Sequence, residues 1–171
     1  MEMKKYLITG GTGFIGRNLT RALVKAGYRV RILDNNSRGS LQSLKDIKKE
    51  FEFIKGDVRN PGVVRKSCKG VDGVIHLAAV NGTKFFYSMP EVVLDVATRG
   101  MINVIDGCLW NGVSELFLAS SSEVYQVPPQ VPTPEDVPMV IPDPANPRFS
   151  YAGGKIISEL LVTNYGRKYF K

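Results

Sequence analysis

The chain has 171 residues, of which 43% are hydrophobic and 23% are charged, and its formal net charge is +7. This length suits one domain with a buried core, and this composition excludes an intrinsically disordered chain. The sequence contains no run of about eighteen consecutive apolar residues, which argues against a membrane-spanning helix. The basic residues are scattered, so we expect no nucleic-acid partner, whereas a modest positive field suits an anionic small ligand.

The compartment is indicated by the cysteines and by the N-terminal segment. Cys68 and Cys108 lack C-x-x-C spacing, so we expect neither a disulfide scaffold nor a metal site. The first apolar segment is short and runs into glycines instead of a cleavage site, which is not the pattern of a secretory signal. We therefore expect a cytoplasmic protein.

Short apolar runs alternate with segments of helical periodicity along the chain. The first run, 5–9, is followed by a predicted helix over 14–26, which Gly27 ends. Further strands are predicted at 29–33, 51–54, 73–77 and 115–119, and further helices from Pro90 to about Trp110 and from about Ser150 to the end. This alternation predicts an α/β fold with a doubly wound parallel sheet, covered by helices on both faces.

One segment, 127–148, is unlike the rest of the chain because it holds eight of the ten prolines. Proline removes a backbone donor and fixes one dihedral angle, so this segment predicts an extended surface loop. A linker between domains is the alternative. Strong motifs on both sides favour a loop within one domain.

A glycine-rich turn, Gly10-Gly-Thr-Gly13-Phe-Ile-Gly16, lies between the first predicted strand and the first predicted helix. Absent side chains allow a phosphate to approach the backbone, and the helix N-terminus offers free N–H groups and a positive dipole. Gly16 would let the helix pack closely on the sheet. This context favours a dinucleotide site of the Rossmann type.

Two acidic residues follow the next two strands. Asp34 stands 18 residues after Gly16, where a carboxylate accepts hydrogen bonds from the adenosine ribose and repels the extra phosphate of NADP, so NAD is favoured. A simple turn residue is the alternative for Asp34, and Arg38 could instead help to hold a 2′-phosphate. Asp57 lies where an adenine amino group could bind, or it caps its strand.

The residues with acid–base chemistry lie in the second half of the chain. Tyr151 and Lys155 are four residues apart on a predicted helix and share one face. A nearby ammonium group favours the phenolate, so we expect a lowered pKa for Tyr151 and a role as general base. Ser120, Ser121 and Ser122 follow the fifth predicted strand, where a hydroxyl could orient a substrate. The alternatives are two ordinary surface residues for Tyr151 and Lys155, and a helix cap or ST-turn for the serines.

Together these motifs resemble the extended short-chain dehydrogenase/reductase family, in its NAD-dependent epimerase/dehydratase branch. The resemblance covers essentially the whole chain. It rests on six motifs in family order: Thr-Gly-Gly-Thr-Gly-Phe-Ile-Gly at 9–16, Asp34-Asn35-x-Ser37-x-Gly39, Gly56-Asp57, His76-Leu77-Ala78-Ala79, Ser-Ser-Ser-Glu-Val-Tyr at 120–125, and Tyr151-x-x-x-Lys155.

The resemblance implies a role for each matching residue. Ser121 would be the catalytic serine, Tyr151 the base, and Lys155 its partner, which also holds the nicotinamide ribose. His76 is interpreted as a buried strand residue, not as a catalyst. The NAD-binding residues would be Gly10, Gly13, Phe14, Ile15, Gly16, Asp34, Asn35, Asp57, Val58, Leu77, Ala78, Ala79, Tyr151 and Lys155.

The implied reaction begins on the sugar of a nucleotide-sugar substrate. Tyr151 takes the proton of the 4-hydroxyl while hydride passes from carbon 4 to bound NAD, and epimerisation, dehydration or decarboxylation follows. The pair Ser122-Glu123 resembles UDP-glucuronate decarboxylases more than simple 4-epimerases. Glu123 would then be a catalytic acid or base, although a surface position is the alternative.

The chain also departs from the family pattern. Relatives are roughly twice as long by resemblance, so we expect residues 1–171 to form the NAD-binding domain without the C-terminal substrate domain, and to leave an apolar sheet edge or face exposed. Ala97 replaces an expected Asn, whose role Asn103 could take over, and Gln126 replaces a Gly. We expect a homodimer through the helices from Pro90 and Ser150. An NAD(P)-dependent ketone reductase and a non-catalytic dinucleotide-binding fragment are the alternative functions.

Overall fold

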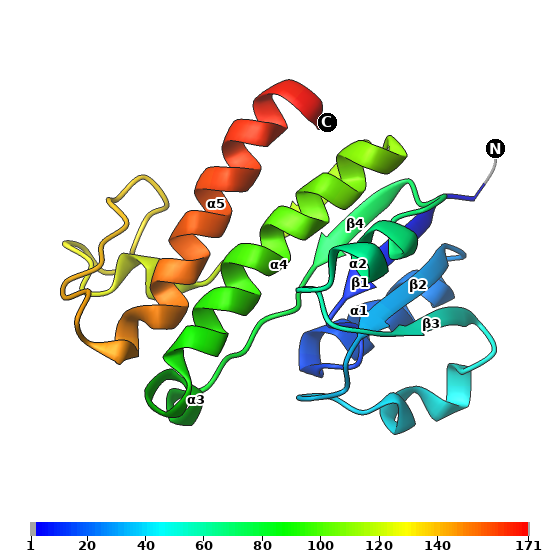
Figure 1. Ribbon diagram of the computed structural model, residues 1–171, viewed down its shortest axis with the longest axis horizontal. Coiled ribbons are helices and arrows are strands. Elements are labelled where there is room, and N and C mark those ends of the chain that lie inside the picture. Colours follow the sequence, from blue (N-terminus) through cyan, green and yellow to red (C-terminus); the bar gives the residue numbers. More distant parts are fainter. Residues whose placement is uncertain (1–2, 171) are drawn as a thin grey trace.

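A computed structural model describes residues 3–170, in which five parallel strands form one sheet (Figure 1). Met1, Glu2 and Lys171, at the ends of the N-terminal segment and of the last predicted helix, lie outside the described residues. The strands are β1 (Lys5–Thr9), β2 (Arg29–Asp34), β3 (Phe51–Lys55), β4 (Gly73–His76) and β5 (Glu115–Leu118). Their spatial order, β3-β2-β1-β4-β5, is that of a Rossmann-type sheet, which confirms the predicted fold class.

The helices include three that the sequence pattern indicated. These are α1 (Phe14–Lys25), α4 (Pro90–Asn111) and α5 (Ser150–Tyr169). Two shorter helices, α2 (Pro61–Ser67) and α3 (Thr83–Ser88), were not predicted, and neither were three 3₁₀ turns, η1 (Leu41–Ile47), η2 (Ser122–Tyr125) and η3 (Pro147–Phe149). The short elements depend on local caps, such as the Asn60 side chain that accepts a hydrogen bond from the Val63 N–H at the start of α2.

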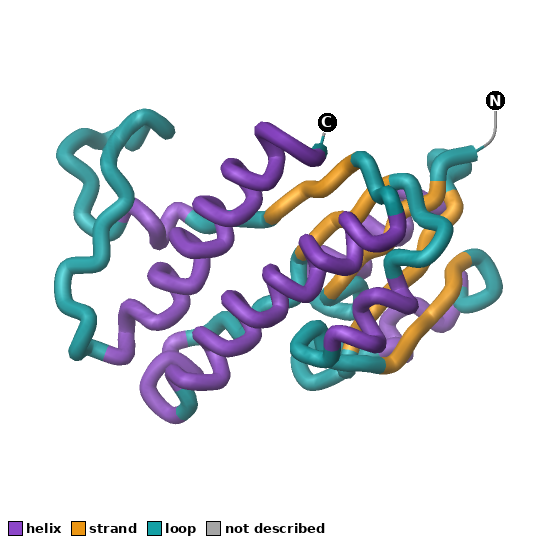
Figure 2. The backbone as a smooth tube through the Cα atoms, turned by 45° about the horizontal axis from the view of Figure 1, so that its top comes forward, coloured by secondary structure: helices purple, strands orange, loops and turns teal. Residues whose placement is uncertain are grey.

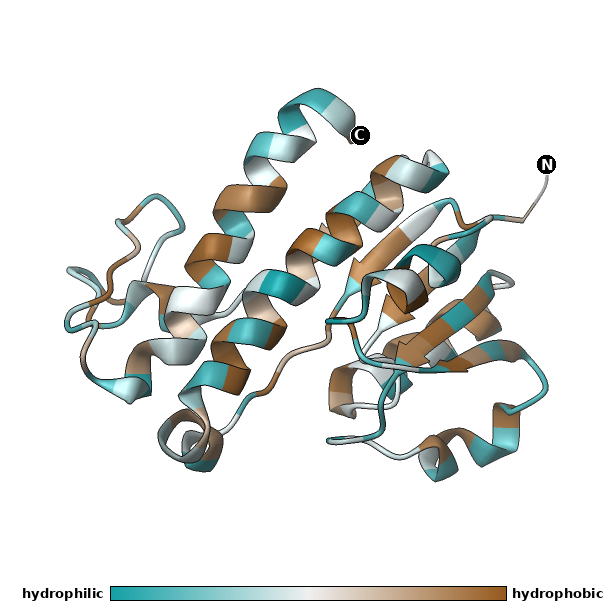
Figure 3. Cartoon of the chain, in the orientation of Figure 1, coloured by the Kyte–Doolittle hydropathy of each residue, from teal (hydrophilic) through white to brown (hydrophobic). Residues whose placement is uncertain are grey.

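The helices cover the sheet on two faces, and α4 and α5 lie side by side along one of them (Figures 1 and 2). Successive residues of a strand point to opposite faces, so Leu7 packs under α2 and α4 while Ile8 packs under α1. Hydrophobic and hydrophilic residues alternate along α4, as expected for a helix with one face on the core (Figure 3). The prediction of a sheet covered on both faces is therefore confirmed.

The contact between α4 and α5 positions the residues that were expected to be catalytic. A Cβ atom added to Gly154 would meet the Ala97 side chain at 2.6 Å, so two small residues bring the helices together. The Ser158 hydroxyl of α5 lies 3.3 Å from the Ala97 carbonyl oxygen. Asn103 is buried and donates to the Val58 carbonyl oxygen at 2.9 Å, a bond that ties α4 to the segment after β3. Ala97 thus serves close packing where the family pattern has Asn.

The proline-rich segment 127–148 is irregular apart from the start of η3, as predicted (Figure 1). It is not a free linker, because the Val140 N–H donates to the Val124 carbonyl oxygen at 3.0 Å and ties the segment to η2. Its C-terminal end leads through η3 directly into α5. Among the described residues, β5 is an edge strand, and the Phe117 side chain on it is 52% exposed.

Candidate active and cofactor-binding site

The strand register places one edge of the sheet under a cleft. Thr9 pairs with both Leu33 and His76, so β1, β2 and β4 end at the same level. The cleft opens where the chain turns away from these ends and from the end of β3, which is the expected ligand site of such a sheet. Its lining residues are Gly10, Gly13, Leu33, Asp34, Asn35, Ser37, Arg38, Gly39, Gly56, Asp57, Val58, Leu77, Ala78, Ala79, Val80 and Val96.

The glycine turn has the geometry that a phosphate site requires. Gly10 has φ of 72°, and a Cβ atom there would lie 2.9 Å from the Ala78 backbone. Gly13 is the N-cap of α1 and offers no side chain to bond the first N–H groups of the helix. Those N–H groups and the helix dipole are therefore available to an anion in the cleft.

The other three predicted residues of this turn contribute differently. A Cβ atom on Gly16 would lie 2.2 Å from the Gly10 carbonyl oxygen, so Gly16 serves the close packing that was predicted for it. The side chains of Phe14 and Ile15 are 75% and 63% exposed and do not line the cleft. Only their backbone N–H groups, in the first turn of α1, could serve a bound anion.

Asp34 has the turn role that was the alternative for it, and it also lines the cleft. Its carboxylate is buried and accepts hydrogen bonds from the Thr12 N–H at 2.9 Å and the Asn36 N–H at 2.7 Å. It therefore ties the end of β2 to the glycine turn while it lines the cleft. Arg38 donates to the Asn81 carbonyl oxygen at 2.8 Å and stacks on Phe85, with 4.3 Å from the guanidinium carbon to the ring centroid.

Asp57 lies at the end of the cleft beyond β3 and belongs to a hydrogen-bonded network. Arg59 donates to both of its carboxylate oxygens, at 2.8 Å and 3.0 Å, and the Asn35 amide donates at 3.1 Å. The Arg59 guanidinium is the main cause that lowers the pKa of Asp57 to about 2. Asp57 is therefore ionised and fixed in orientation. Sequence reasoning missed Arg59, although it stands only two residues away.

His76 at the end of β4 is buried, as expected. Its Nδ1 atom lies 2.7 Å from the Thr9 hydroxyl, which in turn accepts a hydrogen bond from the Ala78 N–H at 3.2 Å. Burial, with a smaller contribution from the Lys155 charge, lowers the pKa of His76 to about 3. The imidazole is neutral at physiological pH and joins two strand ends, so it holds Leu77, Ala78 and Ala79 along the cleft.

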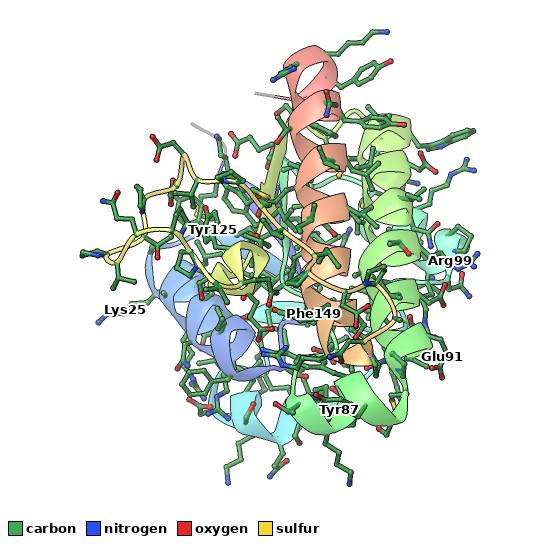
Figure 4. All side chains as sticks on the ribbon, turned by 90° about the vertical axis from the view of Figure 1, so that its left-hand side faces the viewer. Lys25, Tyr87, Glu91, Arg99, Tyr125 and Phe149 are labelled. Atoms are coloured by element: carbon green, nitrogen blue, oxygen red, sulfur yellow. The ribbon has the colours of Figure 1, made fainter. Side chains whose placement is uncertain are left out.

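The expected catalytic residues come together from η2 and α5, and Figure 4 views this side of the molecule, with Tyr125 of η2 and Phe149 before α5 labelled. Tyr151 is buried, and its ring stacks on Phe86 of α3 at a centroid distance of 5.4 Å. The Lys155 Nζ atom lies 5.7 Å from the Tyr151 ring centroid and donates to the Ala119 carbonyl oxygen at 2.6 Å. The Ser121 hydroxyl accepts a hydrogen bond from the Glu123 N–H at 3.2 Å.

The expected lowering of the Tyr151 pKa is wrong for this structure. Burial raises the pKa of Tyr151, the negative charge of Glu123 raises it further, and hydrogen bonding with Ser121 acts in the opposite direction. The ammonium group of Lys155 is itself desolvated, which lowers its pKa to about 8, and it is directed to the Ala119 carbonyl oxygen. Sequence spacing showed that the two side chains share a helix face but not how deeply the phenol is buried.

Glu123 is partly exposed and forms an ion pair. Its Oε2 atom lies 2.7 Å from the Nη1 atom of Arg148, and the two side chains are 29% and 33% exposed. The Arg148 guanidinium carbon lies 5.2 Å from the ring centroid of Phe86. Sequence reasoning missed both Arg148 and Phe86. For Arg148, its place three residues before Tyr151 was the available signal.

Two further findings concern the described part of the chain. In residues 3–170, no group of three or more His, Cys, Asp or Glu side chains is arranged to hold a metal ion. In the same range, every helix is too short or too polar to cross a membrane.

Together, a Rossmann-type sheet, a glycine turn at an uncapped helix and a group of Ser, Tyr and Lys side chains are the features of the short-chain dehydrogenase/reductase class. The chain belongs to the NAD dependent epimerase/dehydratase family, whose family model matches residues 6–171.

Three relatives illustrate this membership. A UDP-glucose 4-epimerase of Neisseria meningitidis serogroup B is 32% identical over 95% of this chain and 48% of its own length. The structure of an epimerase from Methanothermobacter thermautotrophicus has a TM-score of 0.87 at 32% identity, over 98% of this chain and 49% of that one. The structure of the UDP-glucose 4-epimerase of Brucella ovis in complex with NAD has a TM-score of 0.84 at 25% identity, over 97% of this chain and 49% of that one. The chain therefore spans about half the length of these relatives.

Proposed function

We propose that this chain is the cofactor-binding and catalytic part of an NAD-dependent nucleotide-sugar epimerase or dehydratase. The observation that carries the proposal is the grouping of Ser121 and Lys155 around Tyr151. These three side chains do not line the cleft itself, but Tyr151 belongs to the cluster against which Ala79 and Val80 of the cleft pack. The relatives act on UDP-sugars by name, which supports a nucleotide sugar as the substrate class.

Several features of the cleft support NAD as its ligand. The uncapped N-terminus of α1, approached over Gly10 and Gly13, would hold the pyrophosphate. The Asp34 carboxylate would accept the ribose hydroxyls and disfavour a 2′-phosphate. Asn35, Asp57, Val58 and the segment Leu77–Ala79 would contact the adenine, phosphates and ribose. When bound, NAD would supply a hydride acceptor for carbon 4 of the sugar.

The side chains around Tyr151 divide the acid–base work. Tyr151 would accept the proton of the sugar 4-hydroxyl, and Ser121 would orient that hydroxyl. Deprotonation of Tyr151 needs a compensating cation, since burial and Glu123 both raise its pKa. Lys155 provides that cation from one turn further along α5, and it would also hold the nicotinamide ribose.

Glu123 would serve as acid or base after the oxidation of carbon 4. Its position beside the phenol is supported by its effect on the Tyr151 pKa. A carboxylate over the sugar suits elimination or decarboxylation as well as epimerisation, and the pair Ser122-Glu123 favours decarboxylation. The relatives named above include 4-epimerases, so all three outcomes belong in the test.

A homodimer is part of the same proposal. The helices α4 and α5 lie side by side and expose large apolar side chains, which favours an interface between helices of two copies. These side chains are Leu94, Ile102, Leu109 and Trp110 on α4, and Ile157 and Leu160 on α5.

The test is a single-turnover experiment on the purified chain, loaded with NAD and mixed with a panel of nucleotide sugars. We expect near-ultraviolet absorbance of reduced NAD and a keto-sugar or its product by mass spectrometry with at least one sugar. Tyr151→Phe should retain NAD and lose the absorbance change. If NAD binds but no nucleotide sugar is oxidised, the chain is a dinucleotide-binding fragment and not a catalyst. Release of the reduced cofactor with a simple ketone as substrate would favour a reductase.

A further inference from the structure

Arg148 stands at the junction between the proline-rich segment and α5. Its backbone is held by η3, because its N–H donates to the Asn146 side chain at 3.0 Å and the Phe149 N–H donates to the Asn146 carbonyl oxygen at 3.1 Å. Since Phe149 leads directly into α5, the start of that helix and the Arg148 side chain have a fixed relation. The Asn146 turn thus sets where the guanidinium points.

The guanidinium contacts both neighbours of the Tyr151 phenol. On one side it donates to Glu123 at 2.7 Å. On the other it lies over Phe86, at 5.2 Å from the ring centroid, and Phe86 stacks on Tyr151 with an interplanar angle of 20°. One side chain therefore joins η2, α3 and α5, the three elements that surround the phenol.

The charges around the phenol show what this arrangement accomplishes. Ser121 and Glu123, at the start of η2, and Lys155 of α5 lie near Tyr151. From α3 and α4, Phe86 and Val93 pack against it and carry no charge. Glu123 is the negative charge of this group, and it opposes ionisation of the phenol. Behind Lys155, its own neighbours are His76 and Glu159.

We propose that Arg148 is a positioning residue for Tyr151, which neutralises the Glu123 carboxylate beside the phenol and holds Phe86 beneath its ring. Without Arg148 the carboxylate would be unpaired next to the base, and deprotonation of Tyr151 would become harder. Removal of the carboxylate should have the opposite effect. The value of this arrangement for catalysis rests on the proposed function.

The test measures ionisation of Tyr151 directly, in the purified chain without NAD or sugar. A fluorinated tyrosine, more acidic than tyrosine, is incorporated at position 151 and titrated by fluorine NMR. We expect Arg148→Met to raise the titration midpoint by about one pH unit and Glu123→Gln to lower it by a similar amount. Arg148→Lys keeps the charge and should move the midpoint least.

The double variant separates an electrostatic role from a structural one. With both changes the two opposite shifts should cancel, so the double variant should titrate near the wild-type midpoint. A double variant that keeps the raised midpoint of Arg148→Met, or no shift for Arg148→Met alone, would overturn the proposal. If Arg148→Met does not fold, Glu123→Gln and Arg148→Lys still decide, because an unmoved midpoint in Glu123→Gln contradicts the argument. None of these readouts requires turnover, so this inference and the proposed function can fail separately.

Discussion

Lys155 offers a prediction about stability that follows from how the site is built. Its side chain is buried between α5 and the end of β5, and its ammonium group donates to the Ala119 carbonyl oxygen at 2.6 Å. Burial lowers its pKa from the usual 10.5 to about 8, and Glu159 compensates only in part. The folded chain therefore holds this proton less tightly than the unfolded chain does.

The sign and size of the effect follow from this difference in pKa. Between pH 8 and pH 10.5 the unfolded chain binds more protons at this residue, so the free energy of unfolding rises with pH across that window. Below the window, burial of the ammonium group costs about 3 kcal/mol. Lys155→Met removes this cost but leaves the Ala119 carbonyl oxygen without its donor, which costs about 1 kcal/mol. We expect the variant to be more stable near neutral pH by about 2 kcal/mol, and the difference to shrink as the pH rises toward 10.5.

The measurement is urea denaturation of both chains at a series of pH values across this window. Lys168→Met, at the exposed C-terminal end of α5, is the matched control and should follow the wild-type curve. If Lys155→Met is less stable than wild type at every pH, or if the two curves run parallel, Lys155 is not a desolvated ammonium group in the folded chain. The reasoning about how it supports Tyr151 would then fail as well.

Two further predictions concern the cofactor cleft. Gly16→Ala would place a Cβ atom 2.2 Å from the Gly10 carbonyl oxygen, so it should lower the free energy of unfolding by about 1–3 kcal/mol and weaken NAD binding. The control Gly166→Ala meets no atom within 4 Å and should be neutral or stabilising. Thermal unfolding measures the stability of both variants, and calorimetry measures their NAD binding. Equal behaviour of the two variants would refute the close packing of the glycine turn. Asp34→Ala should weaken the binding of NAD more than the binding of NADP, because it removes both the acceptor for the ribose hydroxyls and the charge that repels a 2′-phosphate. Direct binding measurements with each cofactor test this. An equal loss of affinity for NAD and NADP would contradict the assignment of Asp34 to the ribose.

The sequence predicted those parts of the fold that depend on local pattern. The five strands are short apolar runs between turn residues, and α1 and α4 carry apolar residues at helical spacing. Their bounds and those of α5 were predicted to within a few residues, although the faces of α5 differ little in hydropathy. The short helices α2 and α3 span too few residues for a period to be recognised. The glycine turn and the Tyr–Lys spacing were informative because both depend on residues close in the chain.

The parts of the site that depend on contacts between distant residues were not predictable in this way. Glu123 and Arg148 are separated by a proline-rich segment, and only its return to η2 brings the two side chains together. Phe86 reaches Tyr151 from α3, a helix with no sequence signature. The predicted direction of the Tyr151 pKa shift was wrong because burial, which spacing does not reveal, and the charge of Glu123 both raise this pKa.

The central claim is that one cleft binds NAD and presents it to Tyr151, and a crystal structure of the chain grown with NAD tests it most directly. We expect the pyrophosphate over Gly10 and Gly13 at the N-terminus of α1, the adenosine ribose on Asp34, and the nicotinamide beside Tyr151 and Lys155. Crystals grown in saturating NAD with no density in this cleft, or with the nicotinamide end directed away from Tyr151, would contradict the account.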